Sequence, residues 1–352
     1  MQRCGALCLL AIGVVTTAGA EVRWADINRQ PAAWYAGSAA HVIATHVLSY
    51  QAPSGGWPKN IDMTQPLSAE YLAAEGSAAQ AATIDNHATT TQLNFLAKVV
   101  AATGDLTFRA AYEQGLDYLL AAQYPSGGWP QFYPRRAGYY AHITYNDNAM
   151  VNVLECLRAV AKHSGPNALV DARRQARVAA AVEQGIACLL RTQVRQAGKL
   201  TAWAAQHDAV TFAPAGARNF EPPALTANEN VGIVRFLLAV QRPSPAIVAA
   251  IEGAVGWLES VKISGYRLDD TLGADGRKDR HLVADPAAPP LWARFYELGT
   301  NQPIFVGRDK IVHYDYNEIE RERRVGYDYL GNWPARLLAQ NYVGWRAQQF
   351  RP

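Results

Sequence analysis

The pentapeptide SGGWP stands at Ser54–Pro58 and again at Ser126–Pro130, and this repeat decides the fold. An acid-amide pair follows each copy, Asp85–Asn86 after the first and Asp147–Asn148 after the second. The paired glycines allow backbone conformations closed to other residues, so each copy is expected to be a tight turn that carries an indole. A loop that recurs in step with a polar pair indicates a structural unit repeated along the chain. We interpret the repeat as a groove suited to a long, polar ligand made of rings.

A second motif recurs at intervals of about 70 residues, a spacing typical of stacked helical units. AYEQGL at Ala111–Leu116 matches AVEQGI at Ala181–Ile186 and AIEG at Ala250–Gly253, and Ala39–Ile43 precedes them at a similar interval. Each copy is expected to open an apolar-periodic stretch of helical length. Further helices are expected after clusters of acid and amide side chains, at Thr89–Ala102, Ala149–Lys162 and Val231–Val240.

This alternation of helix, loop and helix predicts an all-α fold. We expect an α/α barrel (toroid) of repeated helical hairpins, with long functional loops on one face and little β-structure. The best strand candidate is the short stretch Lys310–Tyr316, and the mixed charges of Asn317–Arg324 favour a solvated helix. No Pro/Ser-rich linker divides the chain, so residues 21–352 are expected to form one catalytic domain.

The composition is that of an ordinary globular protein, with 49% hydrophobic and 18% charged residues among 352. A net charge of +3 gives no electrostatic case for nucleic-acid binding. Arg3, the apolar run Ala6–Val15 and the small residues up to Ala20 match a secretory signal, so a secreted or periplasmic monomer without a membrane anchor is expected. Cys156 and Cys188 remain after cleavage, either as a disulfide or as two buried thiols.

The carboxylates Asp85 and Asp147 are the central candidates for chemistry. Either could simply cap a helix, since Asp and Asn are favoured N-caps. A cap needs only one residue, however, and the second cluster is the run Asn146–Asn148. Several oxygen-bearing side chains together suit a hard cation such as Ca²⁺, although the spacing is not that of a single-loop site.

Cations in loops suggest an anionic ligand. Lys59 follows the first SGGWP turn, and Arg218 and Arg308 lie in loops where a surface ion pair with a nearby acid is the alternative. Trp57 and Trp129 could stack on sugars or could pack one repeat on the next. The histidines show no zinc-ligand spacing, and neither a Gly-x-Ser-x-Gly elbow nor a phosphate-binding glycine loop occurs.

Six motifs in order along the chain carry a specific resemblance. They are SGGWPKN (Ser54–Asn60), TIDNHATTT (Thr83–Thr91), SGGWPQFYP (Ser126–Pro134), HITYNDNAMVNV (His142–Val153), WAAQHD (Trp203–Asp208) and FVGRD (Phe305–Asp309). Together they resemble the pectate lyases of polysaccharide lyase family 10. The resemblance implies an α/α barrel and calcium-dependent β-elimination of polygalacturonate, which yields 4,5-unsaturated oligogalacturonides.

The resemblance also implies roles for residues. Asp85 and Asp147 would hold Ca²⁺ with a substrate carboxylate, and Arg218 would remove the C5 proton. The residues expected to bind substrate are Lys59, Arg308, Asn86, Asn146, His142, Trp57 and Trp129. An arginine has a pKa above about 12, so a neutral arginine base implies alkaline activity and surroundings that lower this pKa.

The chain departs from the family pattern in three places. Asn219–Pro223 reads NFEPP where Tyr-Glu-Leu-Pro-Ser is more usual, His87 replaces a Gly, and Ala141 stands where an acid is often found. These departures bear on subsite preference more than on reaction type.

Three other interpretations compete with a lyase. An inverting glycoside hydrolase would use Asp85 and Asp147 as acid and base about 6.5–9.5 Å apart. A non-catalytic protein could bind acidic polysaccharide through the tryptophan loops. A triterpene-cyclase-like toroid would need an aromatic cavity, which cationic loops argue against.

Overall fold

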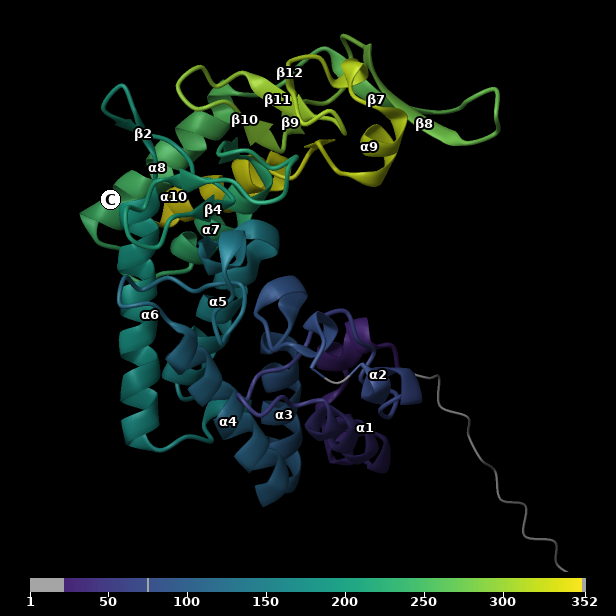
Figure 1. Cartoon of the computed structure of the whole chain (residues 1–352). Helices are drawn as coiled ribbons and strands as arrows, with labels where there is room; N and C mark the ends of the chain where they lie inside the picture. Colours follow the sequence, from purple (N-terminus) through teal and green to yellow (C-terminus); the bar gives the residue numbers. More distant parts are fainter. Residues whose placement is uncertain (1–21, 75, 350–352) are drawn as a thin grey trace, which may run out of the picture.

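The computed structural model describes residues 22–74 and 76–349 (Figure 1). The predicted signal peptide, residues 1–20, lies outside this part of the chain. No helix in the described part has the length and apolar character needed to cross a membrane.

Helices dominate the structure and form two layers (Figure 1). The inner layer contains α3 (Thr90–Thr103), α5 (Ala149–Ala161), α7 (Asn228–Leu238) and the π-helical turn Leu337–Tyr342, which continues into α10 (Val343–Gln349). The outer layer contains α1 (Ser38–Ser49), α4 (Leu106–Ala122), α6 (Ala172–Thr192) and α8 (Pro245–Ser260). Each inner helix packs on its inner neighbours and on an outer partner. The all-α prediction is confirmed, and this alternation is the helical-hairpin repeat of an α/α barrel.

The inner helices begin close to where the sequence predicts, but the outer helices begin earlier. The motifs Ala111–Leu116, Ala181–Ile186 and Ala250–Gly253 lie inside α4, α6 and α8 rather than at their starts. The caps stand upstream: Asp105 accepts from the backbone N–H of Thr107 at 2.8 Å, and Asp171 accepts from that of Arg174 at 2.7 Å. A side-chain cap satisfies a free N–H of the first turn, so the helix starts where the cap stands.

The two repeated sequence motifs contact each other. Gly55 and Gly127 have φ values of 97° and 90°, and a Cβ there would lie 2.5 Å and 2.1 Å from the carbonyl oxygens of Gln114 and Gln184. The Trp57 ring approaches Gly115, where a Cβ would lie 2.7 Å from the indole. Each SGGWP turn therefore docks on the Gln-Gly step of the next outer helix. This contact explains why the two motifs recur together.

The tryptophans of these turns belong to the core, so their assignment to substrate binding was wrong. Trp57 and Trp129 are 0% exposed. Their indole N–H groups donate to the carbonyls of Val47 and Leu119, at 2.7 Å and 2.8 Å. An indole buried with its N–H satisfied packs the structure and offers no face to a sugar.

The same hydrogen bond, from an indole N–H to a carbonyl of an outer helix, occurs in four repeats of the described chain, whereas the SGGWP motif marks only two. Trp203 donates to Leu189 and Trp292 to Leu258, both at 2.8 Å. Trp292 is hidden from a sequence search because a long insertion separates it from α8.

A glutamine joins consecutive outer helices in three of the repeats. The Nε2 atoms of Gln51, Gln123 and Gln193 each donate to one carbonyl of the adjacent turn and to one of the next outer helix. The acceptors on the outer helices are Ala111, Ala181 and Ala250, at 2.9, 2.9 and 2.8 Å. These acceptors are the first residues of the repeated helix motif, whose function is therefore structural.

Short strands connect the helical pairs. Three antiparallel groups contain β1 (Ile143–Thr144), β4 (Gln206–His207) and β5 (Pro214–Ala215); β6 (Leu225–Thr226), β10 (Phe295–Tyr296), β11 (Pro303–Val306) and β12 (Val312–His313); and β9 (Trp292–Ala293) with β13 (Leu330–Gly331). The strand predicted at Lys310–Tyr316 is confirmed only as the two residues of β12. The remaining hairpins are β2 (Arg195–Gln196) with β3 (Lys199–Leu200), and β7 (Tyr266–Leu272) with β8 (Lys278–Ala284).

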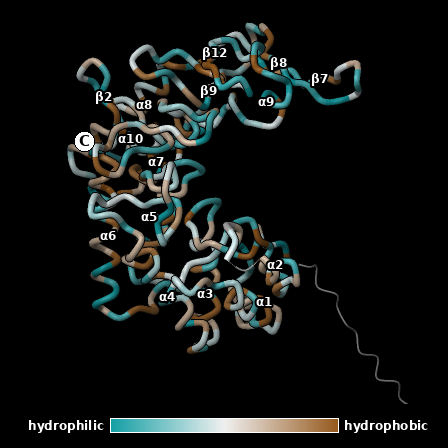
Figure 2. Tube along the Cα trace, viewed as in Figure 1, coloured by the Kyte–Doolittle hydropathy of each residue, from teal (hydrophilic) through white to brown (hydrophobic). Residues whose placement is uncertain are grey.

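The β7–β8 hairpin is the insertion before Trp292 and projects from the helical layers (Figure 1). Hydrophilic residues run along it (Figure 2), and Arg280 donates across the strands to Asp270 at 2.6 Å. None of its strand side chains is buried, so it lacks the apolar alternation that marks a strand in sequence.

The segment Asn317–Arg324 is not one solvated helix. It is divided between the 3₁₀ turn Tyr316–Glu318 and α9 (Arg321–Gly326). Arg324 is buried and donates through Nη2 to both carboxylate oxygens of Asp279 on β8, at 2.8 Å each. This ion pair fastens α9 to the hairpin.

The remaining helical elements are short. They are the 3₁₀ turns Trp24–Arg29, Ala32–Ala36, Ala78–Gln80, Asp85–His87, Gly138–Ala141, Asn146–Asn148 and Gly165–Asn167, and α2 (Ala69–Ala73).

Cys156 and Cys188 are free and buried, which decides between the two alternatives in favour of thiols. Burial raises the pKa of Cys156 to about 12 and that of Cys188 to about 11. Both are therefore protonated, inert core residues.

Candidate functional site

Two 3₁₀ turns, η4 (Asp85–His87) and η6 (Asn146–Asn148), lie against each other before α3 and α5. Their backbones are left-handed: φ is 48° at Asn86 and 52° at Asp147. Asn and Asp tolerate this region better than most residues, and such conformations concentrate at functional sites. Neither α3 nor α5 has a side-chain cap, so the capping interpretation of Asp85 and Asp147 is wrong.

Asp85 is 4% exposed and holds three hydrogen bonds. Its Oδ2 accepts from the Lys59 ammonium and from Gln131 Nε2, the latter at 2.6 Å, and its Oδ1 accepts from the Asn86 backbone N–H at 3.0 Å. Lys59 is one-third exposed, so this cation can reach a ligand from the same position. The structure thus brings together two of the predicted residues that lie far apart in sequence.

Asp147 lies in a second cluster that contains an arginine the sequence analysis missed. Its Oδ2 accepts from Asn146 Nδ2 at 2.8 Å, and its Oδ1 accepts from Arg294 Nη2 at 3.2 Å. Arg294 also donates to the fully buried Glu229 at 2.7 Å and to Asn146 Oδ1 at 3.2 Å. Burial lowers the pKa of Arg294, but the charges of Glu229, Tyr327 and Asp147 outweigh it and raise the pKa overall. Arg294 therefore stays cationic and neutralises the two acids.

Arg218 forms a bidentate pair with Glu221. Its Nε and Nη2 atoms donate to the two carboxylate oxygens at 2.8 Å and 2.5 Å. Arg218 is 46% exposed, whereas the Glu221 side chain is 7% exposed, so the pair is more than a surface contact. The hydrogen bonds that Arg218 donates to Glu221 raise the pKa of Arg218. Burial raises the pKa of Glu221, but the hydrogen bond and charge of Arg218 lower it overall.

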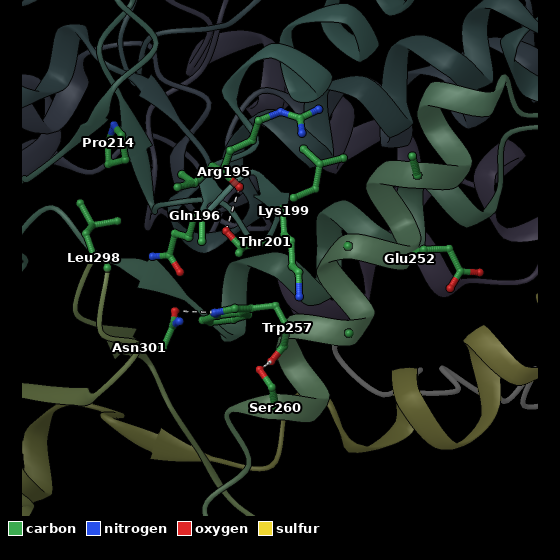
Figure 3. Close-up of a pocket in the computed structure, with 17 residues that line it drawn as sticks. Arg195, Gln196, Lys199, Thr201, Pro214, Glu252, Trp257, Ser260, Leu298 and Asn301 are labelled. Carbon is green, nitrogen blue, oxygen red and sulfur yellow. Dashed lines mark hydrogen bonds between the residues drawn. The ribbon is translucent and has the colours of Figure 1, made fainter.

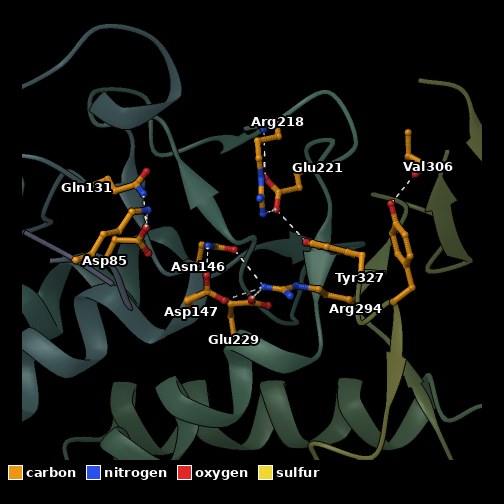
Figure 4. A network of polar contacts seen from close by, with 12 residues as sticks. Asp85, Gln131, Asn146, Asp147, Arg218, Glu221, Glu229, Arg294, Val306 and Tyr327 are labelled. Atoms are coloured by element: carbon orange, nitrogen blue, oxygen red, sulfur yellow. Dashed lines mark hydrogen bonds and ion pairs between the residues drawn. The ribbon is translucent and has the colours of Figure 1, made fainter. Parts of the chain in front are cut away.

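Tyr327 connects this pair to the Asp147 cluster (Figure 4). Its hydroxyl donates to Glu221 Oε1 at 2.9 Å, and the Arg294 guanidinium carbon lies 5.0 Å from the centre of its ring. Asp147 and Arg218 thus belong to one polar network, and Asp85 lies on the turn that packs against η6.

Arg218 and Arg308 line the same pocket, of about 480 Å³, together with Lys310 and Arg323. Arg308 is exposed and bonds to Glu322 through Nε and Nη2 at 2.8 Å each. The Arg323 guanidinium carbon lies 3.8 Å from the centre of the Phe220 ring. Four cations around one pocket suit an anionic ligand. Lys310 and Arg323 went unnoticed because their segments were interpreted as a strand and a solvated helix.

The other predicted binding residues lie in different surroundings. Asn86 Nδ2 donates to Asn60 Oδ1 at 2.9 Å, in the loop that carries Lys59. His142 lies close enough to His207 to help lower its pKa to about 4, an effect mainly of burial. Trp57 and Trp129 are core residues and lie outside the site.

The donors present partly fit a calcium ion. Carboxylate oxygens from Asp85 and Asp147 on adjacent turns are hard ligands of the kind Ca²⁺ takes. Within residues 22–74 and 76–349, no group of three or more His, Cys, Asp or Glu side chains forms a metal cage. Calcium prefers about 6–8 oxygen ligands, so an ion here would need oxygens from the ligand and from water. The arrangement suits binding of a metal together with an acidic ligand.

A family profile and two solved structures each match most of the chain, and all three are polysaccharide lyases. The profile of the pectic acid lyase family matches residues 51–338. A family 10 polysaccharide lyase from Cellvibrio cellulosa is similar in structure, with a TM-score of 0.78 and 33% identity, over 92% of this chain and 95% of that one. A variant of the Cellvibrio lyase with one aspartate replaced by alanine, solved in complex with trigalacturonic acid, has a TM-score of 0.76 and 33% identity, over 92% and 98% of the two chains. None of the curated proteins matches.

Proposed function

The chain belongs to the pectic acid lyase family and is a family 10 polysaccharide lyase, and on that premise we propose that it cleaves polygalacturonate by calcium-dependent β-elimination with Arg218 as the base. The observation that carries this proposal is the connected site. Two aspartate-bearing turns lie side by side, and one of them is joined through Arg294 and Tyr327 to Arg218, in a pocket lined by cations. Membership of a lyase family favours this chemistry over the hydrolase and the cyclase.

In this proposal the acidic substrate is held by charge. Lys59 and Arg308 bind uronate carboxylates, and Asn86 and Asn146 donate to sugar oxygens from the two turns. Calcium held by Asp85, Asp147 and the substrate would neutralise the uronate carboxylate and make the C5 proton more acidic. The trigalacturonic acid bound to the Cellvibrio variant supports an oligogalacturonide ligand.

The reaction needs a proton transfer and a bond cleavage. Arg218 takes the C5 proton, the C5–H electrons form the C4=C5 double bond, and the C4–O bond breaks. The departing oxygen takes a proton from water. Glu221 opposes this role in the free enzyme because it stabilises charged Arg218. We infer that the substrate must draw Arg218 away from Glu221 before the reaction; a cation held nearby would lower the arginine pKa.

The first test is an assay on polygalacturonate with calcium and with EDTA. We expect a rise in ultraviolet absorbance from the C4=C5 double bond when calcium is present, and its loss in EDTA, with recovery when calcium is restored. Reducing ends released without ultraviolet absorbance would indicate a hydrolase and contradict the proposal. Full activity in EDTA would contradict the calcium requirement alone.

A second test concerns Glu221→Gln. Replacing the carboxylate removes its charge and weakens the hydrogen bond that is the main cause of the raised pKa of Arg218, so this pKa falls and the neutral base becomes available at lower pH. The rising limb of the kcat/KM profile is expected to move about one unit toward acid, a modest shift because Arg218 is partly solvated.

The matched control is Glu322→Gln, which removes the partner of Arg308 in the same pocket. Arg308 has no proton-transfer role in the proposal, so the rising limb should stay in place. Equal shifts in both variants, or no shift in Glu221→Gln, would show that Arg218 is not the titrating base.

We also propose that residues 1–20 direct export and that the enzyme is a monomer. A polymeric substrate is too large to enter a cell, which supports a secreted or periplasmic enzyme.

A further inference from the structure

A second cavity, of about 1300 Å³, lies against α8 and is larger than the pocket at Arg218 (Figure 3). The β2–β3 hairpin, α8 and the loop at residues 298–301 form its walls. Its lining residues do not include the residues that join Asp85, Asp147 and Arg218. Its rim includes Pro214, in the segment that leads to Arg218. Binding pockets for single small molecules are about 300–1,000 Å³, so this volume suits several sugar units.

The cavity contains polar groups without protein partners. Neither amide atom of Gln196 has a hydrogen-bond partner in the described part of the chain, although both atoms are buried. Figure 3 shows its amide and the Lys199 ammonium directed into the space beside Trp257. Both atoms are closed to water in this conformation, and because a buried unpaired amide is unfavourable, a turn of the Gln196 side chain toward a ligand that supplies a donor and an acceptor is favoured. A sugar hydroxyl supplies both.

Within the described chain, the charged side chains that line the cavity without a side-chain partner are cationic. Arg195 and Lys199 line it, and neither has an acid partner among the described residues; the guanidinium of Arg195 contacts the carbonyl of Gly198 at 3.2 Å. The acid in the lining is Glu252, which accepts a hydrogen bond from the Tyr342 hydroxyl at 2.5 Å. The ligand that complements this wall carries carboxylates.

The floor of the cavity is open because of glycine. A Cβ at Gly256 would meet nothing within 4 Å, whereas one at Gly253 would lie 2.6 Å from Leu200 Cβ. Gly253 thus lets β3 pack on the helix, and Gly256 leaves space. The neighbouring Trp257 is buried, and its indole N–H donates to Asn301 at 2.8 Å, so it forms a wall and not a stacking face.

We propose that this cavity is a second, non-catalytic binding site for a segment of an oligouronate chain, and that it tethers the polymer while another segment occupies the catalytic site. The proposal rests on the proposed function for its ligand class. A second contact on one polymer makes the first binding event effectively intramolecular, which can raise the overall affinity by about 10²–10⁴-fold. Short oligomers that cannot reach both sites gain nothing.

The test is Gly256→Phe, with Gly256→Ala as its matched control. The phenyl ring enters free space and occupies the part of the cavity beside α8, while the alanine adds only a methyl group and leaves it open. We expect Gly256→Phe to raise KM on long polygalacturonate about tenfold or more, with kcat, and both constants on trigalacturonate, unchanged. Gly256→Ala should match the parent on both substrates.

Lys199→Glu is a second variant, at an exposed position where folding is not at risk, and it should raise the polymer KM in the same way. Direct binding gives an independent readout: calorimetric titration of Arg218→Ala with trigalacturonate should show two sites, and one after Gly256→Phe is added. Unchanged polymer KM in both variants, or one site throughout, would overturn the proposal. If the protein binds trigalacturonate at the cavity but releases no unsaturated product, the proposed function fails and the second site stands.

Discussion

Replacing Arg218 with alanine is expected to lower kcat on polygalacturonate by about 10²–10⁴-fold, the usual contribution of a positioned general base. The substitution removes the group proposed to take the C5 proton, while the proposed carboxylate ligands Lys59 and Arg308 remain, so KM should change far less. The measurement is the initial rate of ultraviolet absorbance at saturating substrate and calcium.

Arg267→Ala is the matched control, because Arg267 is 47% exposed and also pairs with an acid, but lies on the β7–β8 hairpin. Its kcat should stay within about twofold of the parent, as expected for a surface pair. Since Glu221 loses its main partner in Arg218→Ala, rates are normalised to the folded fraction from circular dichroism. A kcat within tenfold of the parent, with a large rise in KM, would make Arg218 a carboxylate ligand and contradict the base assignment.

Replacing Trp129 with alanine is expected to lower the free energy of unfolding by about 3–5 kcal/mol, the range for a buried tryptophan. Trp129 is 0% exposed, lies against Gly185 of α6 and donates to Leu119 of α4. Its loss leaves a cavity where a turn docks on the next outer helix. The measurement is equilibrium unfolding in urea followed by circular dichroism.

Trp129→Phe separates packing from the hydrogen bond. It keeps a ring in the core but leaves the Leu119 carbonyl without the indole N–H, so a loss of about 1–3 kcal/mol is expected. Both variants should keep the parent KM on trigalacturonate when folded. A raised KM with unchanged stability would restore the interpretation of Trp129 as a sugar-stacking residue.

The repeat was predictable because its parts are local. The SGGWP turn needs a left-handed glycine, which leaves a mark in a short window of sequence, whereas the caps Asp105 and Asp171 went unrecognised and the outer helices begin earlier than predicted. The helix of the fourth repeat was recognised at Ala250–Gly253, but its indole, Trp292, escaped because it follows an inserted hairpin. No strand side chain of that hairpin is buried, so its sequence carries no period-2 pattern of apolar residues.

Part of the site could be predicted from sequence, and its roles only through the resemblance to family 10 pectate lyases. Acid-amide pairs after each turn pointed to Asp85 and Asp147, and loop cations pointed to Lys59, Arg218 and Arg308. Arg294 was invisible, because a single arginine in a loop signals nothing until Glu229 and Asp147 lie within 3.2 Å of it. The roles of the calcium ligands and of the base remain predictions.

By itself the sequence determined that helical pairs repeat, where the inner helices begin and which turns carry acids, since each of these follows from side chains near one another in the chain. Tertiary structure alone decided that the tryptophans are buried, that Lys59 pairs with Asp85 and that Arg294 joins Asp147 to Glu229. It also placed Tyr327 against the Arg218–Glu221 pair, whose two members are close in sequence. These contacts join residues from separate repeats, and burial and ion pairing depend on distances in space that no local pattern records.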